Sequence, residues 1–398
     1  MASDVQVTNG ASKDASTDGK NEGISEEEIA LYDRQIRLWG MKAQEKIRTA
    51  NILLITCRAL GNEIAKNLVL AGIGSITILD HEVVSPDDLG AQFLITEADI
   101  GKPRAEAVRP PLQKMNPRVT ITADTSIAAL KDPSFYATFT LTIATDLDYT
   151  ALCTINEAAN FSARPFYAAC LHGLYGFAFA DLITHDYQIE RQVLSTTTLL
   201  GPETPSRTLL SVTPTPSTGP GAPHREVLTK REVYYPLRIA NSSPLPPTIT
   251  RLARRKKQVP PLLTCARALF EFQAAHLGRS PSHAAADLAA FTQLARATHD
   301  MLSLPRETLT AEFLKGFLAS LHAEVAPAAA WVGGFVAQDV INVLGRREQP
   351  LQNFGVFDGE SGEARVFALQ PIFEAEGMGN GMAMRQAGAQ ASTDQAPL

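Results

Sequence analysis

Short runs of branched apolar residues alternate with segments of helical periodicity over the first half of the chain. The runs NILLIT (51–56) and SITILD (75–80) are typical of strands buried on both faces, and NEIAKNLVLAGIG (62–74) is typical of a helix that ends at glycines. A strand, a tight turn, a helix and a second strand form a unit whose strands are parallel. Three further strand-like runs extend the pattern to about residue 185: RVTITA (118–123), FTLTIA (139–144) and RPFYAAC (164–170). This pattern predicts an α/β fold with a doubly wound, mostly parallel sheet.

Helical periodicity also marks the segment before the first strand. Ser25, with Glu28 three residues later, has the pattern of a capping box, and apolar residues recur at helical spacing from Ile29 to Ala43. Gly40 lies inside this stretch, so we expect two short helices. The longest apolar stretch, 325–344, contains proline, glycine, asparagine and aspartate and is therefore expected to be a buried helix with no role in a membrane.

Changes in composition divide the chain into segments. Twelve of the 25 prolines fall between Pro202 and Pro261, which favours a long loop there, and an Ala-rich segment of helical period follows and must break at 278–281. The expected divisions are a disordered tail (1–24), the first part of the α/β domain (25–185), a Pro-rich and partly disordered linker (186–261), a helical insertion (262–321), the return to the α/β domain (322–371) and a second disordered tail (372–398).

Charge and cysteine usage exclude several functions. The 398 residues are 45% hydrophobic and carry a formal charge of −6, which is typical of a globular protein and gives no reason to expect nucleic acid as a partner. The N-terminus lacks the pattern of a signal peptide, so an intracellular protein is expected. No metal site is expected, because no spacing suits zinc, and each of four single cysteines is expected to be an inert thiol: Cys57, Cys153, Cys170 and Cys265.

The turn after the first strand is where a Rossmann-like fold binds a nucleotide phosphate through a Gly-x-Gly-x-x-Gly loop. Thr56, Arg58 and Gly61 occupy the three glycine positions, so only the last glycine is present. Threonine does not readily adopt the conformation of the first glycine, and arginine is bulky where the backbone should approach the phosphate. We infer a damaged phosphate site, or a domain that never bound a nucleotide. Asp80 stands where an acid would accept a ribose hydroxyl, although it is equally suited to capping the strand end.

Two basic groups admit two interpretations each. Arg34 and Arg37 lie three residues apart beside Tyr32 and Trp39, and they either stay solvated or paired with a carboxylate such as Asp33, or form an anion-binding finger. The cluster at 254–257 is either solvated loop charge or a nuclear-import signal.

Five segments together carry a family resemblance: LYDRQIRLWGMKAQEKIRTANILLIT (31–56), GNEIAKNLVLAGIGSITILDHEVVSPDDLGAQFLI (61–95), DIGKPRAEA (99–107), APAAAWVGGFVAQDVINVL (326–344) and NFGVFDG (353–359). They resemble the non-thioester subunits of heterodimeric SUMO-activating enzymes, in the ubiquitin-activating family with the ThiF/MoeB-like adenylation fold. The likeness covers roughly residues 24–185 and 310–370. It implies a pseudo-active half of an adenylation enzyme with an inserted, mainly helical subdomain.

The resemblance also implies a division of labour. A partner subunit would bind ATP and magnesium, adenylate the SUMO C-terminal glycine and form the thioester, and SUMO would then pass to a SUMO-conjugating enzyme in the nucleus. Arg34 would act as an arginine finger in the partner's ATP site. Asp80 and Asp146 match a ribose-binding and a magnesium-associated acid of active members and would be relics, while Arg104 stands where those members carry lysine. The phosphate-contacting arginine is missing, because 88–92 reads Asp-Leu-Gly-Ala-Gln.

Other functions stay open from the sequence. The equivalent subunit of the NEDD8-activating enzyme has a similar N-terminal motif, although a larger helical insertion is expected there. A stand-alone adenylyltransferase for a sulfur-carrier protein would need its own ATP site, which Thr56 and Arg58 argue against. A pure interaction scaffold and a nicotinamide-dependent oxidoreductase complete the list, and the damaged glycine loop makes the oxidoreductase the weakest of them.

Overall fold

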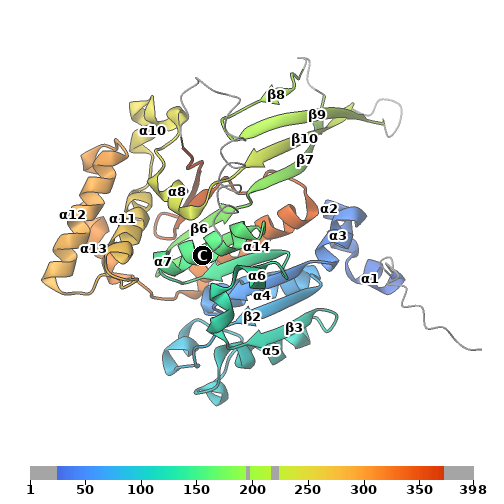
Figure 1. Ribbon diagram of the computed structural model, residues 1–398, viewed down its shortest axis with the longest axis horizontal. Coiled ribbons are helices and arrows are strands. Elements are labelled where there is room, and N and C mark those ends of the chain that lie inside the picture. Colours follow the sequence, from blue (N-terminus) through green and yellow to red (C-terminus); the bar gives the residue numbers. More distant parts are fainter. Residues whose placement is uncertain (1–24, 194–197, 217–223, 372–398) are drawn as a thin grey trace, which may run out of the picture.

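A computed structural model describes residues 25–193, 198–216 and 224–371; both expected tails lie outside these ranges. Its centre is an eight-stranded sheet with the order β12-β11-β6-β5-β4-β1-β2-β3 (Figure 1). The strands are β1 (Asn51–Ile55), β2 (Ser75–Leu79), β3 (Thr120–Asp124), β4 (Leu141–Thr145), β5 (Phe166–His172), β6 (Tyr175–Asp181), β11 (Phe354–Asp358) and β12 (Glu363–Phe367).

Five neighbouring strands, β3, β2, β1, β4 and β5, are parallel. Their apolar residues are in register, with Ile52 of β1 paired to Ile76 of β2 and to Leu141 of β4. The chain reverses after β5, so that β6, β11 and β12 extend the sheet in antiparallel pairs. The prediction of a mostly parallel α/β sheet is confirmed, and the antiparallel strands are an addition to it.

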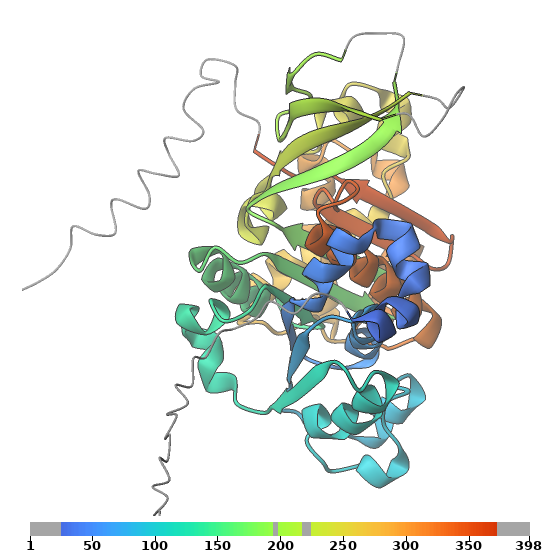
Figure 2. The same cartoon turned by 90° about the vertical axis from the view of Figure 1, so that its right-hand side faces the viewer.

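Helices cover both faces of the sheet (Figures 1 and 2). Helices α3 (Met41–Arg48), α4 (Ala59–Ala71), α5 (Arg104–Met115) and α14 (Ala326–Gly345) share one hydrophobic cluster with the sheet. On the other face, the cluster includes α7 (Tyr149–Phe161), α11 (Pro261–Ala275), α12 (Ala285–Met301) and α13 (Ala311–Ala319). The sheet is therefore doubly wound.

Helix α14 is long and apolar enough to cross a membrane by length and composition, but it is a core helix here. It packs on α4 and on β5 and β6, and Val336 and Val340 are fully buried. The prediction of a buried helix over 325–344 is confirmed.

The prediction of a Pro-rich linker over 186–261 is wrong for most of the residues that the structure describes there. Residues 184–233 form a second, antiparallel sheet of order β7-β10-β9-β8, although 194–197 and 217–223 lie outside the description. Its strands are β7 (Thr184–Gln192), β8 (Gly201–Pro202), β9 (Arg207–Thr215) and β10 (Arg225–Val233). Ion pairs join neighbouring strands, including Arg207 with the buried Glu232 at 2.7 Å. The strands are stabilised by paired charges as well as apolar contacts, so their hydrophobic alternation is weak.

The remaining helices are short or lie at the periphery: α1 (Glu26–Leu31), α2 (Asp33–Trp39), α6 (Pro133–Tyr136), α8 (Leu237–Ser242), α9 (Pro247–Thr250), α10 (Ala253–Lys257) and 3₁₀ turns at Pro86–Gly90, Glu97–Asp99, Ile127–Lys131 and Arg306–Thr308. Ser25 and Glu28 form the predicted capping box. The N-terminal helices break at Gly40, as predicted, and also at Tyr32. The helical block expected over 262–321 consists of α11, α12 and α13, with no helix between Ala275 and Ala285, and it shares its core with the sheet.

Candidate functional site

The carboxyl ends of β1, β2 and β4 meet at one edge of the sheet, where open α/β sheets bind their ligands. Thr56 follows β1, Asp80 follows β2 and Asp146 follows β4. Arg58 and Gly61 lie at the start of α4, next to the same edge. The structure therefore brings together all five residues that the sequence assigns to the degenerate nucleotide site.

The backbone of the glycine loop keeps its turn without the first glycine. Thr56 has a φ of +66°, which a β-branched residue rarely adopts. Its N–H donates to Leu79 O at 2.9 Å, and its carbonyl accepts from Thr145 Oγ1 at 2.7 Å. The expectation that threonine would avoid this conformation is wrong, because these hydrogen bonds from the flanking strands hold it in place.

Gly61, the remaining glycine of the motif, has a role in packing. A Cβ at this position would lie 2.7 Å from Thr56 O, closer than van der Waals contact allows. The third glycine of such loops permits close approach of helix and strand. Gly61 therefore keeps the packing role of the third glycine, and this role does not depend on a bound nucleotide.

The expected ribose acid is engaged by the protein itself. Asp80, 2% exposed, accepts from Cys57 N–H at 2.8 Å and from Arg104 Nη1 at 2.9 and 3.2 Å. Arg104 also pairs with the buried Asp88 at 3.4 Å. Burial alone would lower the pKa of Arg104, but the two carboxylates raise it above its usual value. Burial opposes ionisation of Asp88, yet hydrogen bonds from Ser85 and the charge of Arg104 lower its pKa.

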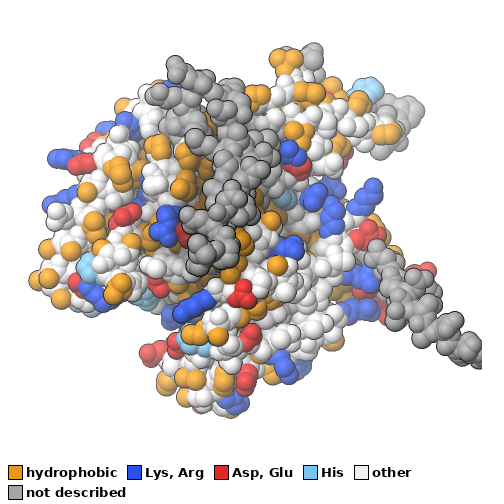
Figure 3. All heavy atoms as spheres, viewed as in Figure 1, with side chains coloured by type: hydrophobic (Ala, Val, Ile, Leu, Met, Phe, Trp, Pro, Cys, Tyr) orange, Lys and Arg blue, Asp and Glu red, His pale blue; other side chains and the backbone are white. Residues whose placement is uncertain are grey.

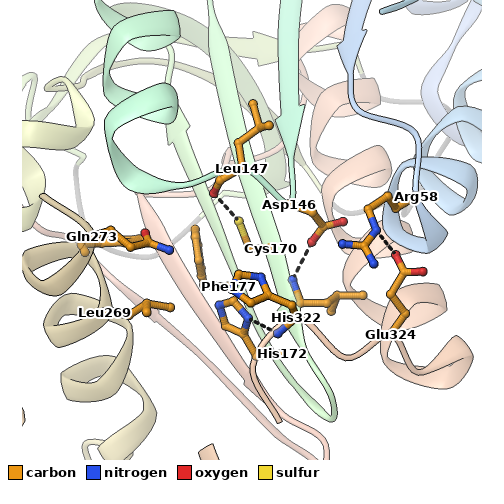
Figure 4. A pocket seen from close by; sticks show the side chains of 12 residues that line it. Arg58, Asp146, Leu147, Cys170, His172, Phe177, Leu269, Gln273, His322 and Glu324 are labelled. Carbon is orange, nitrogen blue, oxygen red and sulfur yellow. Dashed lines mark hydrogen bonds and ion pairs between the residues drawn. The ribbon is translucent and has the colours of Figure 1, made fainter. Parts of the chain in front are cut away.

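The phosphate position is also engaged, by a residue that the sequence did not single out. Glu324 Oε1 accepts from Ala59 N–H, in the first turn of α4, at 3.0 Å and pairs with Arg58 Nε at 3.1 Å (Figure 4). Glu324 Oε2 accepts from Gln92 Nε2 at 3.2 Å. No motif could have found Glu324, because it lies 265 residues after Ala59 in the sequence.

Asp146 lies beside this ion pair in a small polar cavity that His172 and Cys170 also line (Figure 4). Burial and, to a smaller extent, the charge of Glu324 raise the pKa of Asp146 to about 7, although the hydrogen bond from Leu171 N–H opposes the shift. Burial also lowers the pKa of His172 to about 3. Asp146 and His172 are therefore both neutral between about pH 3 and pH 7, beside the charged pair of Arg58 and Glu324. Among the residues that the structure describes, no group of three or more His, Cys, Asp or Glu side chains could hold a metal ion.

These contacts do not fit a bound nucleotide with magnesium. The N–H and guanidinium groups that would face a phosphate already bind Glu324, and the acid that would face a ribose already binds Arg104. Asp146, the acid that the resemblance associates with magnesium, has a pKa of about 7 because it is buried. The chain keeps the backbone geometry of a nucleotide site, but its own side chains fill the site.

Arg34 lies at a different place. It is exposed on α2 and makes no hydrogen bond or ion pair with the residues that the structure describes, whereas Arg37 pairs with Asp33 at 3.0 Å. Tyr32, which precedes α2, packs against Gly72 at the C-terminal end of α4. That end is about 20 Å from the phosphate position, since a 13-residue helix rises about 1.5 Å per residue. Arg34 is therefore no part of this chain's own site.

Helix α2 is held firmly beneath Arg34. Gln35 Nε2 donates to Leu70 O at 3.2 Å, and Asn116 Nδ2 donates to the Tyr32 hydroxyl at 2.9 Å. At the other end, Arg347 Nη1 donates to Trp39 O at 2.9 Å. Figure 3 shows Lys and Arg side chains over the part of the surface where α2 and α3 lie. Helix α2 is thus fixed by hydrogen bonds, and the guanidinium of Arg34 that it carries is exposed and unpaired among the described residues.

All four cysteines are buried free thiols. Burial raises the pKa of Cys153 to about 11 and raises those of the other three further. A thiolate is the reactive form of cysteine, so none of these thiols suits thioester chemistry in this conformation.

The fold and the site together define a nucleotide-binding-type α/β domain whose own site is internally filled. The sequence matches the model of the ThiF family over residues 32–374, and the chain belongs to this family.

Three relatives are similar along almost their whole length. The DNA damage tolerance protein RHC31 of Saccharomyces cerevisiae is 36% identical over 361 residues, covering 90% of this chain and 99% of that protein. The DNA damage tolerance protein rad31 of Schizosaccharomyces pombe is 35% identical, covering 88% of this chain and 99% of that protein. The SUMO-activating enzyme subunit 1 of Homo sapiens is 32% identical, covering 88% of this chain and 97% of that protein.

Proposed function

We propose that this chain is the non-thioester subunit of a heterodimeric SUMO-activating enzyme. With a partner subunit it supports ATP-dependent adenylation of the SUMO C-terminal glycine, and the thioester then forms on the partner's cysteine. The proposal draws on the similarity to human SUMO-activating enzyme subunit 1. The observation that carries it is the combination of a self-filled site with an exposed Arg34 that has no partner among the described residues and lies on a firmly held helix.

The self-filled site supports a partner subunit as the one that binds ATP and magnesium. Glu324 and Arg104 already satisfy the groups that would bind a phosphate and a ribose. A nucleotide would have to break the buried Arg104–Asp80 pair and the partly exposed Arg58–Glu324 pair, and breaking a buried pair by removing one partner costs about 3–5 kcal/mol. The isolated chain is therefore inactive, and a stand-alone sulfur-carrier adenylyltransferase is the less favoured alternative.

Arg34 supplies charge to the reaction in the partner's site. Attack of a carboxylate on the α-phosphate builds negative charge there and on the departing pyrophosphate. A guanidinium offsets such charge most effectively when it is already oriented, because no reorganisation is needed during the reaction. The hydrogen bonds of Gln35, Tyr32 and Trp39 hold the helix that carries Arg34, and Arg34 has no competing carboxylate among the described residues.

The outer side of α4 and α14 supplies part of the contact with the partner. Trp331 on α14 is 42% exposed although its ring stacks on Phe357 at 4.2 Å, and Leu70 of α4 is 46% exposed. Large exposed apolar side chains on neighbouring helices favour a protein interface.

The test is SUMO-dependent exchange between ATP and pyrophosphate, measured for this chain alone, for the thioester-forming subunit alone and for the mixture. We expect exchange in the mixture and none with this chain alone. Arg34→Ala should lower the exchange rate of the assembled complex roughly 10²- to 10³-fold, the usual effect of removing one preorganised donor. Arg37→Ala is the matched control, because Arg37 lies on the same helix but is paired with Asp33.

Two results would contradict the proposal. Exchange by this chain alone would show that its own site binds ATP. Equal rates for the Arg34→Ala and wild-type complexes, at equal assembly by size-exclusion chromatography, would remove the finger role and leave a scaffold.

A nuclear location belongs to the same proposal and places the enzyme beside its SUMO-conjugating enzyme. Its support is the basic helix α10, in which Arg254 and Arg255 are exposed and Lys257 forms a weak ion pair with Glu307 at 3.2 Å. A fluorescent fusion of the full chain should accumulate in the nucleus, and replacement of the four basic residues at 254–257 by alanine should reduce that accumulation. Unchanged accumulation would exclude α10 as an import signal.

A further inference from the structure

The N-terminal end of α4 binds a carboxylate as it would bind a phosphate. Glu324 accepts hydrogen bonds from the Ala59 N–H at 3.0 Å and from the Gln92 amide at 3.2 Å. It is also ion-paired with the Arg58 guanidinium at 3.1 Å (Figure 4). Backbone N–H groups at a helix N-terminus, together with a guanidinium, form a site that favours any anion. Here the anion is a side chain of the same molecule.

The loop before α14 places Glu324 in this position. Gly173 N–H donates to Ala323 O at 2.8 Å, and His322 N–H donates to His172 Nδ1 at 3.3 Å. Helix α14 begins two residues after Glu324. The backbone is thus fixed on both sides of the glutamate, which makes its carboxylate a tethered ligand with a high effective concentration.

The cavity beside Glu324 has room for one small molecule only. Its volume of about 10 Å³ matches one water molecule, far less than a phosphate group needs. Three buried polar atoms of residues that line it, Arg58 Nε, Asp146 Oδ2 and His172 Nε2, make no hydrogen bond with the described residues, although Arg58 Nε is within ion-pair distance of Glu324. Because His172 Nδ1 accepts from His322, its Nε2 carries the proton and faces the cavity as a donor. The cavity therefore offers polar partners to a single water molecule, and Glu324 forms part of its wall.

We propose that Glu324 is the resident anion of a latent phosphate-binding site, and that this side chain excludes a free phosphate or pyrophosphate from the N-terminus of α4. Three donors suited to a phosphate, the Ala59 N–H, the Arg58 guanidinium and the Gln92 amide, are present despite the loss of two glycines. The exclusion of phosphate by Glu324 is independent of the proposed function. One consequence does rest on that function: Glu324 would be a residue that decides which half of the heterodimer holds the nucleotide.

The direct test is Glu324→Ala in the full-length chain. The substitution leaves the Ala59 N–H, Arg58 and Gln92 without their shared acceptor. Inorganic phosphate and pyrophosphate are the probes, titrated at constant ionic strength and pH 6.5, with binding measured by calorimetry and by the shift in melting temperature. We expect the variant to bind pyrophosphate at least tenfold more tightly than the wild type.

The chain offers a closely matched control. Glu226 is ion-paired to Arg191 at 2.8 Å, and the side chains of this pair are 10% and 31% exposed, as are those of Glu324 and Arg58. Glu226→Ala therefore removes an equally buried carboxylate without opening a helix N-terminus. It should show the weak pyrophosphate response of the wild type.

A second pair of variants keeps the test decisive if Glu324→Ala does not fold. Glu324→Gln preserves size and one acceptor but removes the charge, and it should bind pyrophosphate more tightly than the wild type. Adding Arg58→Ala to either Glu324 variant should abolish the gain in affinity for pyrophosphate.

Equal pyrophosphate binding by the Glu324 and Glu226 variants would overturn the inference, as would saturable binding of similar affinity by the wild type. The exchange assay tests the proposed function separately, since it depends on the partner and on Arg34. A negative result in the exchange assay would leave the phosphate-binding result intact. A negative result in the pyrophosphate titration would leave the finger role of Arg34 intact.

Discussion

The pairing of Arg104 with Asp80 and Asp88 yields a sharp prediction. The side chains are 7%, 1% and 4% exposed, so removal of the guanidinium leaves two buried carboxylates without their cation. We predict that Arg104→Met lowers the free energy of unfolding by about 3 kcal/mol, near the lower end for a broken buried pair. The lower end applies because Asp80 keeps the N–H donors of Cys57 and Glu82.

The expected shift in melting temperature follows from the size of the protein. The entropy of unfolding is about 2.1 cal/mol/K per residue, so about 3 kcal/mol corresponds to roughly 4 °C in a chain of 398 residues. Denaturation at pH 7, followed by circular dichroism, measures both quantities. Arg231→Met is the control, because the Arg231–Asp186 pair has good geometry at 2.7 Å but is 37% and 33% exposed. It should cost less than about 1 kcal/mol.

A double-mutant cycle and a pH series test the electrostatic cause. Asp80→Asn should recover part of the loss in the Arg104→Met background, which gives a coupling energy above about 1 kcal/mol. The folded pKa of Asp88 is below its usual value, so its stabilisation is present above about pH 4 and is lost as the pH falls. The difference between wild type and Arg104→Met should therefore shrink at acidic pH. A coupling energy near zero, or a difference independent of pH, would refute the reasoning.

Three further predictions concern the same region. The folded pKa of Asp146, about 7, lies above its usual 3.8, so the folded state retains a proton that the unfolded state has lost, and stability should fall as the pH rises from 4 to 7. Asp146→Asn should flatten this slope in denaturation curves across that range. Thr56→Gly should raise the free energy of unfolding by about 1 kcal/mol, because glycine relieves the strain of the positive φ, whereas Thr56→Ala should not. The four cysteines should resist a thiol reagent in the native protein and react on denaturation.

The sequence could predict the main sheet but not the second one. Strands β1, β4 and β5 are almost continuous buried runs because helices cover both faces, and such runs are visible without a structure. In β10, two of the buried positions are charged residues whose partners lie on neighbouring strands: Glu226 pairs with Arg191 of β7, and Glu232 pairs with Arg207 of β9. Prolines at the ends of these strands and in the loops between them made the segment resemble a linker. The pairing across strands is a property of the tertiary structure.

The residues of the candidate site could be predicted, but not their partners. The ends of adjacent parallel strands meet at one edge, so Thr56, Asp80 and Asp146 were expected to lie together. Glu324 comes from a loop far along the chain, and its contact with α4 depends on how α14 packs. The conformation of Thr56 likewise follows from hydrogen bonds to β2 and β4 that no local pattern contains.

The balance of charge explains why a site with this backbone no longer needs a ligand. Two guanidinium groups, of Arg58 and Arg104, face three carboxylates, of Asp80, Asp88 and Glu324. Asp146 adds no charge below about pH 7, because its buried carboxyl is protonated. A phosphate entering this site would therefore meet an excess of negative charge and a helix N-terminus already bound to an acid. Removal of Glu324 leaves two charges of each sign, with free donors at α4, and an incoming phosphate then takes the place of the carboxylate that was removed.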